Sequence, residues 1–346
     1  MSNSSAAKPL ILADPHPRPV DLIFDPATKA RLEALGNVIW HDGSPASDAF
    51  IDHHLPEAVA LIGQSALPKS RLDRAPELKV VFNVEGNFLP NVDYAECHRR
   101  GIPVLCTAPV FAKPVAEMAL GLALAAARRI PQADAAIRAG NESLYGEGDN
   151  FDSILLSGRT LGLVGFGNLG RALLPLLRPF GGPVIAHDPW IHPSVLREAG
   201  VEAVGMDECF ARSQVVFILA ASTTENAGWI GARHFAAMPR HGIVVLASRA
   251  AVVNFSELLA AAASGRIRAA IDVWPEEPIP ADHPARRTPN TILQAHRAGN
   301  IPEIWPGMGQ MVVDDLELVL RGLAPARCQR AQLETVSLLR SKPVSS

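Results

Sequence analysis

The sequence predicts an α/β protein with two doubly wound, parallel-sheet domains and a cleft between them. Three observations support this fold class. A chain of 346 residues is long enough for two domains, each with a core of its own. Apolar, strand-like runs alternate with helical stretches along most of the chain, which favours parallel sheets. A glycine-rich turn that begins at Gly165 joins one such strand to a helix, as in sheets that bind nucleotides.

The composition argues against several classes of protein. A hydrophobic share of 48% and a charged share of 19% are typical of a soluble globular protein. The formal net charge of −3 gives no basic excess, so neither nucleic acid nor a membrane is expected as a partner. Cys97, Cys106, Cys209 and Cys328 are too scattered for a metal site, and no metal is expected. The start lacks an apolar signal-peptide core, which predicts reduced thiols and a cytoplasmic location.

The first part of the chain predicts a small α/β domain. Its strands are predicted at 9–13, 38–40, 58–62, 79–83 and 103–107, and its helices at 26–35 and 92–100. The proline-rich stretch 15–19 is predicted to be a loop. Residues 85–88 follow the fourth strand, and ligands bind at the carboxyl ends of parallel strands. This stretch is therefore either a substrate loop or an ordinary turn.

A long helix is predicted over 113–139, with Pro131 ending or kinking it. Much of this helix is apolar on all sides, so the other domain, a partner subunit or both must cover it. Its longest apolar run, 115–127, is shorter than the roughly 20 residues that a bilayer needs, which indicates a buried helix. An irregular stretch over 140–157 follows.

From Thr160 onward the alternation of strand and helix predicts a doubly wound nucleotide-binding domain. Its strands are predicted at 160–165, 183–187, 201–204, 215–220, 243–247, 267–273 and 291–295, and its helices at 168–180, 206–212, 232–238 and 254–264. Pro175 predicts a kink in the first of these helices. After Ala298 the pattern is helical over 308–323 with no further strand, and this segment could return to cover the first domain.

The glycine motif predicts a phosphate-binding turn, although glycines of this spacing can also serve only a strand-to-helix turn. Gly165 allows the tight turn, Gly167 lets the backbone approach a pyrophosphate, and Gly170 lets the helix pack on its strand. Asp188 ends the next strand 18 residues after Gly170, near the roughly 20 expected for a carboxylate that binds a ribose 2′-hydroxyl. Such a carboxylate would repel a 2′-phosphate, so NAD is predicted over NADP.

Three side chains capable of acid, base or anion chemistry follow three buried strands. They are Arg249, Glu277 and His296. Taken singly, each has an ordinary interpretation as a surface cation, a solvated acid and a core histidine. Because the carboxyl ends of parallel strands meet at one edge of the sheet, the three are predicted to converge on one ligand.

At these residues the sequence resembles the D-isomer-specific 2-hydroxyacid dehydrogenases, a family that includes glyoxylate and hydroxypyruvate reductases and phosphoglycerate dehydrogenase. The resemblance extends over roughly residues 8–325. It rests on GFGNLG at 165–170, ASRAAVVN at 247–254, DVWPEEP at 272–278 and HRAG at 296–299. It implies a flavodoxin-like substrate domain over 1–112, completed by 300–346. It also implies a Rossmann NAD-binding domain over 113–299, whose arm, 113–139, forms a homodimer.

The resemblance also implies an activity, the NAD(H)-dependent interconversion of a small 2-oxo acid and the D-2-hydroxy acid by hydride transfer. Arg249 would bind the substrate carboxylate and polarise the carbonyl, His296 would be the acid/base and Glu277 its partner. Asp272 would contact the nicotinamide carboxamide. The full set of cofactor residues would be Gly165, Gly167, Asn168, Leu169, Gly170, Asp188, Ser248, Asp272 and His296. The substrate loop would be Glu85, Gly86 and Asn87, and the dimer interface would include Ala116, Leu120, Leu122 and Leu124.

Departures from the family pattern affect the substrate pocket most. Ala250 follows the catalytic arginine where the family usually has glycine, and Met118 replaces a histidine of the arm. Glu85 adds an unexpected negative charge to the substrate loop, and Phe88 fills space there. Arg297 follows His296 and either turns away to pair with a surface carboxylate or binds the substrate's distal end. In the second case it would select a 2-oxo acid with polar or anionic groups beyond C3.

The alternative from another class is an NAD-sensing regulatory protein, because the family's fold also occurs in transcriptional corepressors. Intact Arg249, Glu277 and His296 favour the enzyme. Formate oxidation is disfavoured, because that branch of the family has glutamine in place of Glu277. The distance from the returning helix to Ser346 predicts no added amino-acid-sensing domain.

Overall fold

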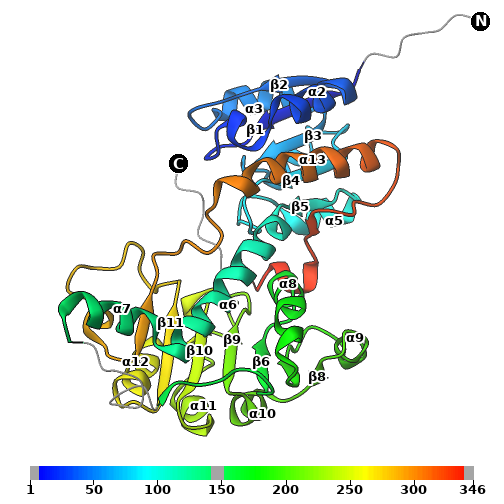
Figure 1. Ribbon diagram of the computed structural model, residues 1–346. Helices are drawn as coiled ribbons and strands as arrows, with labels where there is room; N and C mark the ends of the chain where they lie inside the picture. The colour runs from blue at the N-terminus through cyan, green and yellow to red at the C-terminus, as the bar shows by residue number, and fades with distance from the viewer. Residues whose placement is uncertain (1–7, 142–151, 339–346) are drawn as a thin grey trace, which may run out of the picture. The chain divides into compact units, whose positions relative to one another are not determined.

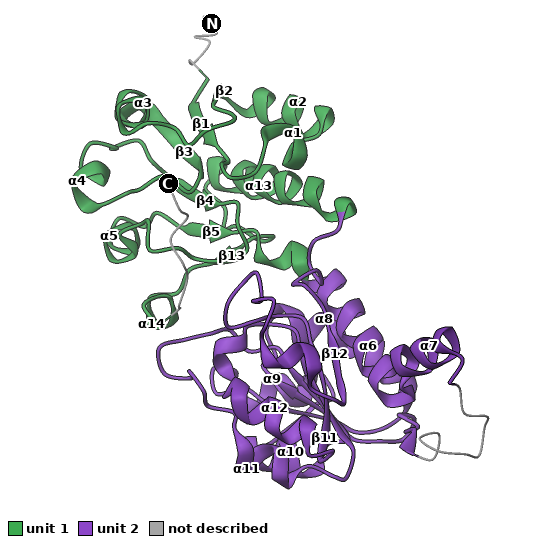
Figure 2. Cartoon of the chain, turned by 90° about the vertical axis from the view of Figure 1, so that its left-hand side faces the viewer, with its two compact units in different colours: residues 1–111, 302–346 green, residues 112–301 purple. Residues whose placement is uncertain are grey.

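The computed structural model describes residues 8–141 and 152–338 (Figure 1). The chain divides into two compact units (Figure 2). Unit 1 contains Met1–Phe111 and Pro302–Ser346, and unit 2 contains Ala112–Ile301. Most of the predicted irregular stretch 140–157 lies outside the described residues.

Unit 1 is built on a six-stranded sheet with the order β13-β5-β4-β3-β1-β2. The strands are β1 (Leu10–Asp14), β2 (Asn37–Trp40), β3 (Ala58–Gly63), β4 (Val80–Asn83), β5 (Val104–Cys106) and β13 (Gln329–Arg330). All neighbours are parallel except β13, which is antiparallel to β5. The prediction of no strand after Ala298 is therefore wrong. The two residues of β13 are both exposed, so they carry no apolar pattern that the sequence could reveal.

Helices cover both faces of this sheet, because successive side chains of its strands point to opposite sides. In β1, Ile11 and Ala13 join one apolar cluster, which includes α13, and Leu12 joins another. The helices of unit 1 are α1 (Val20–Ile23), α2 (Pro26–Leu35), α3 (Asp48–His54), α4 (Lys69–Leu72), α5 (Tyr94–Arg99), α13 (Trp305–Leu320) and α14 (Leu333–Val336). The short 3₁₀ turns are η1 (Leu55–Glu57), η2 (Ala108–Phe111) and η7 (Pro302–Ile304). As the sequence suggested, α13 packs against unit 1, where it contacts α1 and α2.

Local capping explains where several of these helices begin. The Asp25 carboxylate accepts the Thr28 N–H (2.7 Å) at the start of α2, and Pro26 takes the first helical position, where no N–H partner is lost. Asp93 accepts the Glu96 N–H (3.0 Å) at the start of α5 in the same way. A side chain thus fixes the first turn of each helix.

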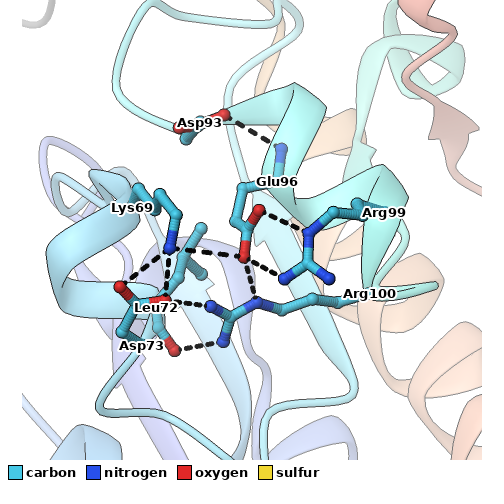
Figure 3. Close-up of polar contacts among 7 residues, drawn as sticks. All are labelled: Lys69, Leu72, Asp73, Asp93, Glu96, Arg99 and Arg100. Carbon is cyan, nitrogen blue, oxygen red and sulfur yellow. Dashed lines mark hydrogen bonds and ion pairs between the residues drawn. The ribbon is translucent and has the colours of Figure 1, made fainter.

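An ionic network joins α4 to α5 on unit 1, as Figure 3 shows. Glu96 is largely buried and accepts hydrogen bonds from Arg99 (2.6 and 2.8 Å) and Arg100 (2.7 Å). Arg100 also contacts Asp73, which pairs with Lys69 (2.8 Å). The hydrogen bonds from Arg99 and Arg100 lower the pKa of Glu96 to about 2.

Unit 2 is built on a seven-stranded parallel sheet with the order β12-β11-β10-β9-β6-β7-β8. The strands are β6 (Leu161–Val164), β7 (Val184–His187), β8 (Glu202–Ala203), β9 (Val215–Ile218), β10 (Gly242–Leu246), β11 (Ile267–Ile271) and β12 (Thr291–Leu293). The central strands are buried along their whole length, which explains their continuous apolar runs. The chain order reverses at β6, between β7 and β9. Ligands of doubly wound sheets bind outside the carboxyl ends of the strands at such a reversal.

The helices of unit 2 include the four predicted after the glycine motif. They are α6 (Ala112–Arg128), α7 (Ile130–Ala139), α8 (Asn168–Leu177), α9 (Pro193–Glu198), α10 (Met206–Arg212), α11 (Ala232–Ala237) and α12 (Phe255–Ala263). The 3₁₀ turns are η4 (Arg178–Phe180), η5 (Ala250–Val252) and η6 (Pro284–Arg287). Pro175 lies in the last turn of α8, and the chain continues into η4. The predicted helix 168–180 is therefore α-helical only as far as Leu177.

The predicted single helix over 113–139 is two helices, α6 and α7. Arg129 has a left-handed backbone (φ 52°), and Pro131 lies in the first turn of α7, so the prediction of a break at this proline is confirmed. The buried Arg268 of β11 donates to the carbonyls of Ala126 (2.8 Å) and Ala127 (3.1 Å) at the end of α6. This guanidinium supplies donors to carbonyls that the broken helix leaves without an intrahelical partner.

α6 packs inside unit 2, against α8, β10 and β11. Its buried residues include Ala116 and Leu122, which are 1% and 4% exposed. These two side chains have almost no surface left for a second subunit, so their assignment to a dimer interface is wrong. Among the described residues, one stretch, Ala108–Arg128, is by length and composition apolar enough to cross a bilayer. About half of its most apolar part is buried inside the protein. The helix predicted at 115–127 is therefore buried on one side only, with Glu117 and Gly121 exposed, so the prediction of a buried helix is confirmed in part.

Candidate active site

The glycine-rich turn connects β6 to α8 at the reversal point of the sheet. Gly165 has a φ of +97°, and a Cβ there would lie 2.8 Å from the backbone N of Ala220. A Cβ at Gly170 would lie 2.7 Å from the carbonyl oxygen of Gly165. Neither position can take a side chain without moving backbone. At Gly167 a Cβ would meet no atom within 4 Å, so this glycine faces open space.

This arrangement suits an anionic cofactor. Gly167 is the N-cap of α8 and has no side chain to occupy the N–H groups of the first turn, which include those of Asn168 and Leu169. The N-terminus of a helix favours negative charge, because the peptide dipoles add along its axis. The open side at Gly167 and the uncapped first turn together fit the pyrophosphate of NAD.

Asp188 follows β7 and lies beside the same turn. One carboxylate oxygen accepts the N–H of Phe166 (2.7 Å), and the other accepts the N–H of Trp190 (2.9 Å). Two backbone donors therefore hold the carboxylate in place, and each oxygen retains a lone pair for a further donor. A fixed carboxylate of this kind can accept hydrogen bonds from a ribose and repels a phosphate.

Arg249 follows β10, beyond Ser248. Its guanidinium donates to the carbonyl oxygen of Ser248 (2.7 Å), and the Ser248 hydroxyl donates to the carbonyl oxygen of Ile218 (3.1 Å) on the neighbouring strand β9. Burial lowers the pKa of Arg249, and the nearby charge of Glu277 opposes that shift. Arginine starts from a pKa so high that this guanidinium stays charged, and partial desolvation strengthens its attraction for an anion.

Glu277 and His296, which are 19 positions apart in the sequence, lie within hydrogen-bond distance. Nδ1 of His296 is 2.7 Å from Oε2 of Glu277. The other oxygen of Glu277 accepts the N–H of Trp274 (3.0 Å), which fixes the carboxylate. An ionised carboxylate can only accept, so the shared proton lies on Nδ1 and Nε2 is left for a reacting group. The His296 side chain is 43% exposed, so a small molecule can reach this ring.

Asp272 is the anchor of the His296 loop, which the sequence did not indicate. It is 1% exposed, and its two carboxylate oxygens accept the N–H groups of Arg297 (3.0 Å) and Ala298 (3.2 Å). Its carbonyl oxygen accepts the N–H of His296 (2.7 Å). These bonds hold His296 in a left-handed backbone (φ 51°), a conformation that costs of order 1–3 kcal/mol and is common at functional sites.

Arg297 has an exposed side chain and a backbone N–H that is bound to Asp272. Within residues 8–141 and 152–338, no carboxylate lies at ion-pair distance from its guanidinium. The first of the two alternatives, pairing with a surface carboxylate, is therefore not formed within the described chain. Its contact with a substrate stays a hypothesis.

The predicted substrate loop lies in unit 1, directly after β4. Glu85 forms a two-point ion pair with Arg18 (2.7 and 3.2 Å). The negative charge that the sequence places in this loop is therefore neutralised by a neighbouring cation. A Cβ at Gly86 would lie 2.8 Å from the ring of Phe111, which explains the glycine. Phe88 is 6% exposed and lies edge-to-face against Tyr94 (6.2 Å), so it belongs to the core of unit 1.

Residues 120–298 match the family model described as "D-isomer specific 2-hydroxyacid dehydrogenase, NAD binding domain". The chain is 31% identical over 290 residues to a glyoxylate reductase of Korarchaeum cryptofilum, a match that covers 83% of this chain and 87% of that protein. Both matches include the glycine-rich turn.

A second relative is longer than this chain. The D-3-phosphoglycerate dehydrogenase of Mycobacterium bovis is 32% identical over 310 residues, which is 88% of this chain but 57% of that protein. The chain thus spans a little over half of this relative's length. Among solved structures, a phosphoglycerate oxidoreductase from Rhizobium etli superposes with a TM-score of 0.85 at 42% identity, covering 95% of this chain and 100% of that one.

Proposed function

The chain belongs to the D-isomer specific 2-hydroxyacid dehydrogenase family, and we propose that it is an NAD(H)-dependent oxidoreductase that interconverts a 2-oxo acid and the D-2-hydroxy acid. The observation that carries the proposal is the pair formed by His296 and Glu277, whose Nδ1 and Oε2 atoms are 2.7 Å apart. A histidine paired with a carboxylate through one nitrogen presents its other nitrogen to a substrate in a defined orientation.

His296 is the proton donor in the reductive direction. Reduction of a ketone produces an alkoxide oxygen, which must receive a proton, and Nε2 of a protonated imidazole supplies it. Glu277 stabilises the imidazolium by its charge and holds the ring through Nδ1. In the oxidative direction, the same nitrogen accepts the proton of the hydroxyl group.

Arg249 binds the substrate carboxylate and polarises the carbonyl group. Its guanidinium has a planar set of donors that matches a carboxylate in a bidentate arrangement. Because Arg249 is partly desolvated, such a contact is stronger than it would be in water. The positive charge also stabilises negative charge that develops on the carbonyl oxygen.

The residues that would hold NAD are those of the glycine-rich turn, together with Asp188, Ser248 and Asp272. When bound, NAD supplies or accepts the hydride. Gly167, Asn168 and Leu169 would present backbone to the pyrophosphate, and Asp188, already fixed by the Phe166 N–H, would accept from the ribose. Asp272 keeps a role in positioning His296 whether or not it also contacts the nicotinamide carboxamide.

Backbone groups of Glu85, Gly86 and Asn87 are proposed to bind the substrate carboxylate in addition to Arg249. Arg297 is proposed to contact polar groups at the substrate's distal end, which an Arg297→Leu variant tests across substrates of different length. The active form is proposed to be a homodimer in the cytoplasm.

The experiment that tests the function is a screen for NADH oxidation. Glyoxylate, hydroxypyruvate, pyruvate, phenylpyruvate and sugar-derived 2-oxo acids are offered in turn, and absorbance of NADH is followed. Turnover with at least one of them is the expected result, since the relatives reported above are named as enzymes. Tight NADH binding without turnover of any 2-oxo acid would instead favour the NAD-sensing regulatory protein.

A further inference from the structure

Three loops of unit 1 are joined at the carboxyl edge of its sheet, the edge where doubly wound sheets bind ligands. They follow β1, β3 and β4. Gln64, after β3, donates through Nε2 to the carbonyl oxygen of His16 (3.0 Å), and its Oε1 accepts the N–H of Val84 (3.1 Å). Arg18, after β1, spans the same gap and reaches Glu85 in the proposed substrate loop.

The guanidinium of Arg18 is fixed on two sides. Nε and Nη2 donate to the two carboxylate oxygens of Glu85, at 2.7 and 3.2 Å. Its central carbon lies 4.6 Å from the ring centroid of Trp305, at the start of α13, so the guanidinium stacks on an indole that is 7% exposed. A guanidinium held in this way loses little conformational freedom when it binds a further group.

Arg18 retains donors for such a group. A guanidinium has five N–H groups, and the ion pair with Glu85 uses two of them. In the described parts of the chain no acceptor binds the other three, and 30% of the side chain is exposed to solvent. The Arg18–Glu85 pair is therefore neutral as a whole, but Arg18 still has N–H groups in fixed directions that can donate to a ligand.

We propose that Arg18 is a specificity-determining residue that binds a second anionic group, a carboxylate or a phosphate, at the distal end of the 2-oxo acid. This inference rests on the proposed function and names the substrate class. The ligand anion accepts charge-assisted hydrogen bonds from the guanidinium of Arg18. Glu85 holds that guanidinium in place and offsets part of its positive charge. The alternative is that Arg18 and Glu85 only clamp two loops together.

The two explanations predict opposite behaviour of the two partners. If Arg18 binds a distal anion, Arg18→Leu removes the donor, whereas Glu85→Gln removes a competing negative charge and leaves the cation. If the pair only joins the two loops, both substitutions loosen the same loops. Both should then change kcat/KM in the same direction for every substrate. The sign of the Glu85→Gln effect therefore separates them.

The experiment measures kcat/KM with NADH for glyoxylate, which has no distal group, and for oxaloacetate, 2-oxoglutarate and 3-phosphohydroxypyruvate. Arg18→Leu, Arg18→Lys and Glu85→Gln are compared with wild type, and Arg31→Leu serves as control because Arg31 pairs with Asp314 (2.8 Å) on the surface of the same unit. Circular dichroism confirms that each variant is folded. Comparison of the two substrates that have a distal carboxylate with the one that has a distal phosphate identifies which anion the site binds.

For at least one anionic substrate, kcat/KM should fall at least about tenfold in Arg18→Leu, mainly through KM, and less in Arg18→Lys. Glu85→Gln should lower KM for that substrate, and glyoxylate turnover should stay within about twofold of wild type in Arg18→Leu, in Arg18→Lys and in the control Arg31→Leu. Equal losses on all substrates, a loss in Glu85→Gln, or a wild type that prefers glyoxylate to every anionic acid would overturn the inference. Absence of any turnover in wild type would instead contradict the proposed function itself.

Discussion

At the scale of single residues, most of the proposed chemistry depends on side chains that backbone groups hold in place. Asp188 is held by two N–H groups, Glu277 by that of Trp274, and the His296 loop by Asp272. The sequence identified Glu277 and His296 because each follows a predicted strand of the same sheet. It did not identify Asp272 as the anchor, because its partners are backbone amides, and backbone amides leave no trace in residue types.

Asp188 should set the preference for NAD over NADP. Its carboxylate is fixed beside the glycine-rich turn and would repel a 2′-phosphate. In Asp188→Ala, the ratio of kcat/KM for NADH to that for NADPH should fall at least about tenfold, and steady-state kinetics with both cofactors measure it. Equal efficiency of wild type with the two cofactors would show that Asp188 does not discriminate.

Arg249 should contribute to both binding and turnover. Loss of a bidentate, charge-assisted contact typically costs about 1.5–3 kcal/mol, or roughly ten- to a hundredfold in kcat/KM. Arg249→Ala should raise KM for the 2-oxo acid and also lower kcat, because the cation polarises the carbonyl group. Arg249→Lys keeps the positive charge but loses the bidentate geometry, so its kcat/KM should lie between those of wild type and Arg249→Ala. A change in NADH affinity alone would place Arg249 at the cofactor and not at the substrate.

At the scale of elements, the strands were predicted well and the short helices less well. The central strands of unit 2 are buried on both faces, so each leaves a continuous apolar run that a sequence reveals. The helices α1, α3, α4, α9 and α14 were not predicted. Of these, α1, α4 and α14 have four residues each, too few to show a helical period. The sequence predicted the break at Pro131 but not the buried Arg268, which comes from a distant strand and binds the carbonyls at the end of α6.

The ionic network between α4 and α5 should make stability depend on pH. The pKa of Glu96 is about 2 in the folded chain, below its ordinary value of 4.5, so the ionised carboxylate favours the folded state. That contribution is present above about pH 4.5 and is lost as the pH falls toward 2. Urea unfolding of Glu96→Gln should therefore show a deficit against wild type near pH 7 that shrinks below about pH 4.5.

The matched control for this measurement is Glu77→Gln, which removes an exposed carboxylate from the same unit. It should leave the free energy of unfolding close to that of wild type at both ends of the pH range. A deficit in Glu96→Gln that stays constant between pH 7 and pH 3 would show that packing, and not charge, explains the loss.

At the scale of the whole molecule, the sequence predicted two doubly wound sheets, and the structure and the comparisons confirm this fold class. The reason is that each sheet is a repeated alternation of strand and helix, which local patterns record. The return of α13 to unit 1 was inferred from its apolar periodicity. The antiparallel β13 was missed, because two exposed residues become a strand only through their pairing with β5.

The proposed homodimer should use the outer face of the arm and not its buried face. Ile130 and Ile137 of α7 are 55% and 66% exposed and lie seven residues apart, on one side of the helix. Light scattering at micromolar concentration should give the mass of a dimer, and Ile130→Asp with Ile137→Asp should give a monomer. Leu323→Asp, at a 48% exposed leucine of unit 1, should leave the mass unchanged. A monomeric wild type would contradict the assembly.

The most direct measurement of the central claim compares NADH oxidation by wild type and His296→Ala, with His53→Ala, a change at an exposed histidine, as control. If His296 donates the proton, wild type and His53→Ala turn over a 2-oxo acid, and kcat falls by about 10²-fold or more in His296→Ala. NADH affinity, followed by fluorescence titration, stays nearly unchanged, because the histidine acts on the substrate's proton. Near-normal turnover in His296→Ala would contradict the account.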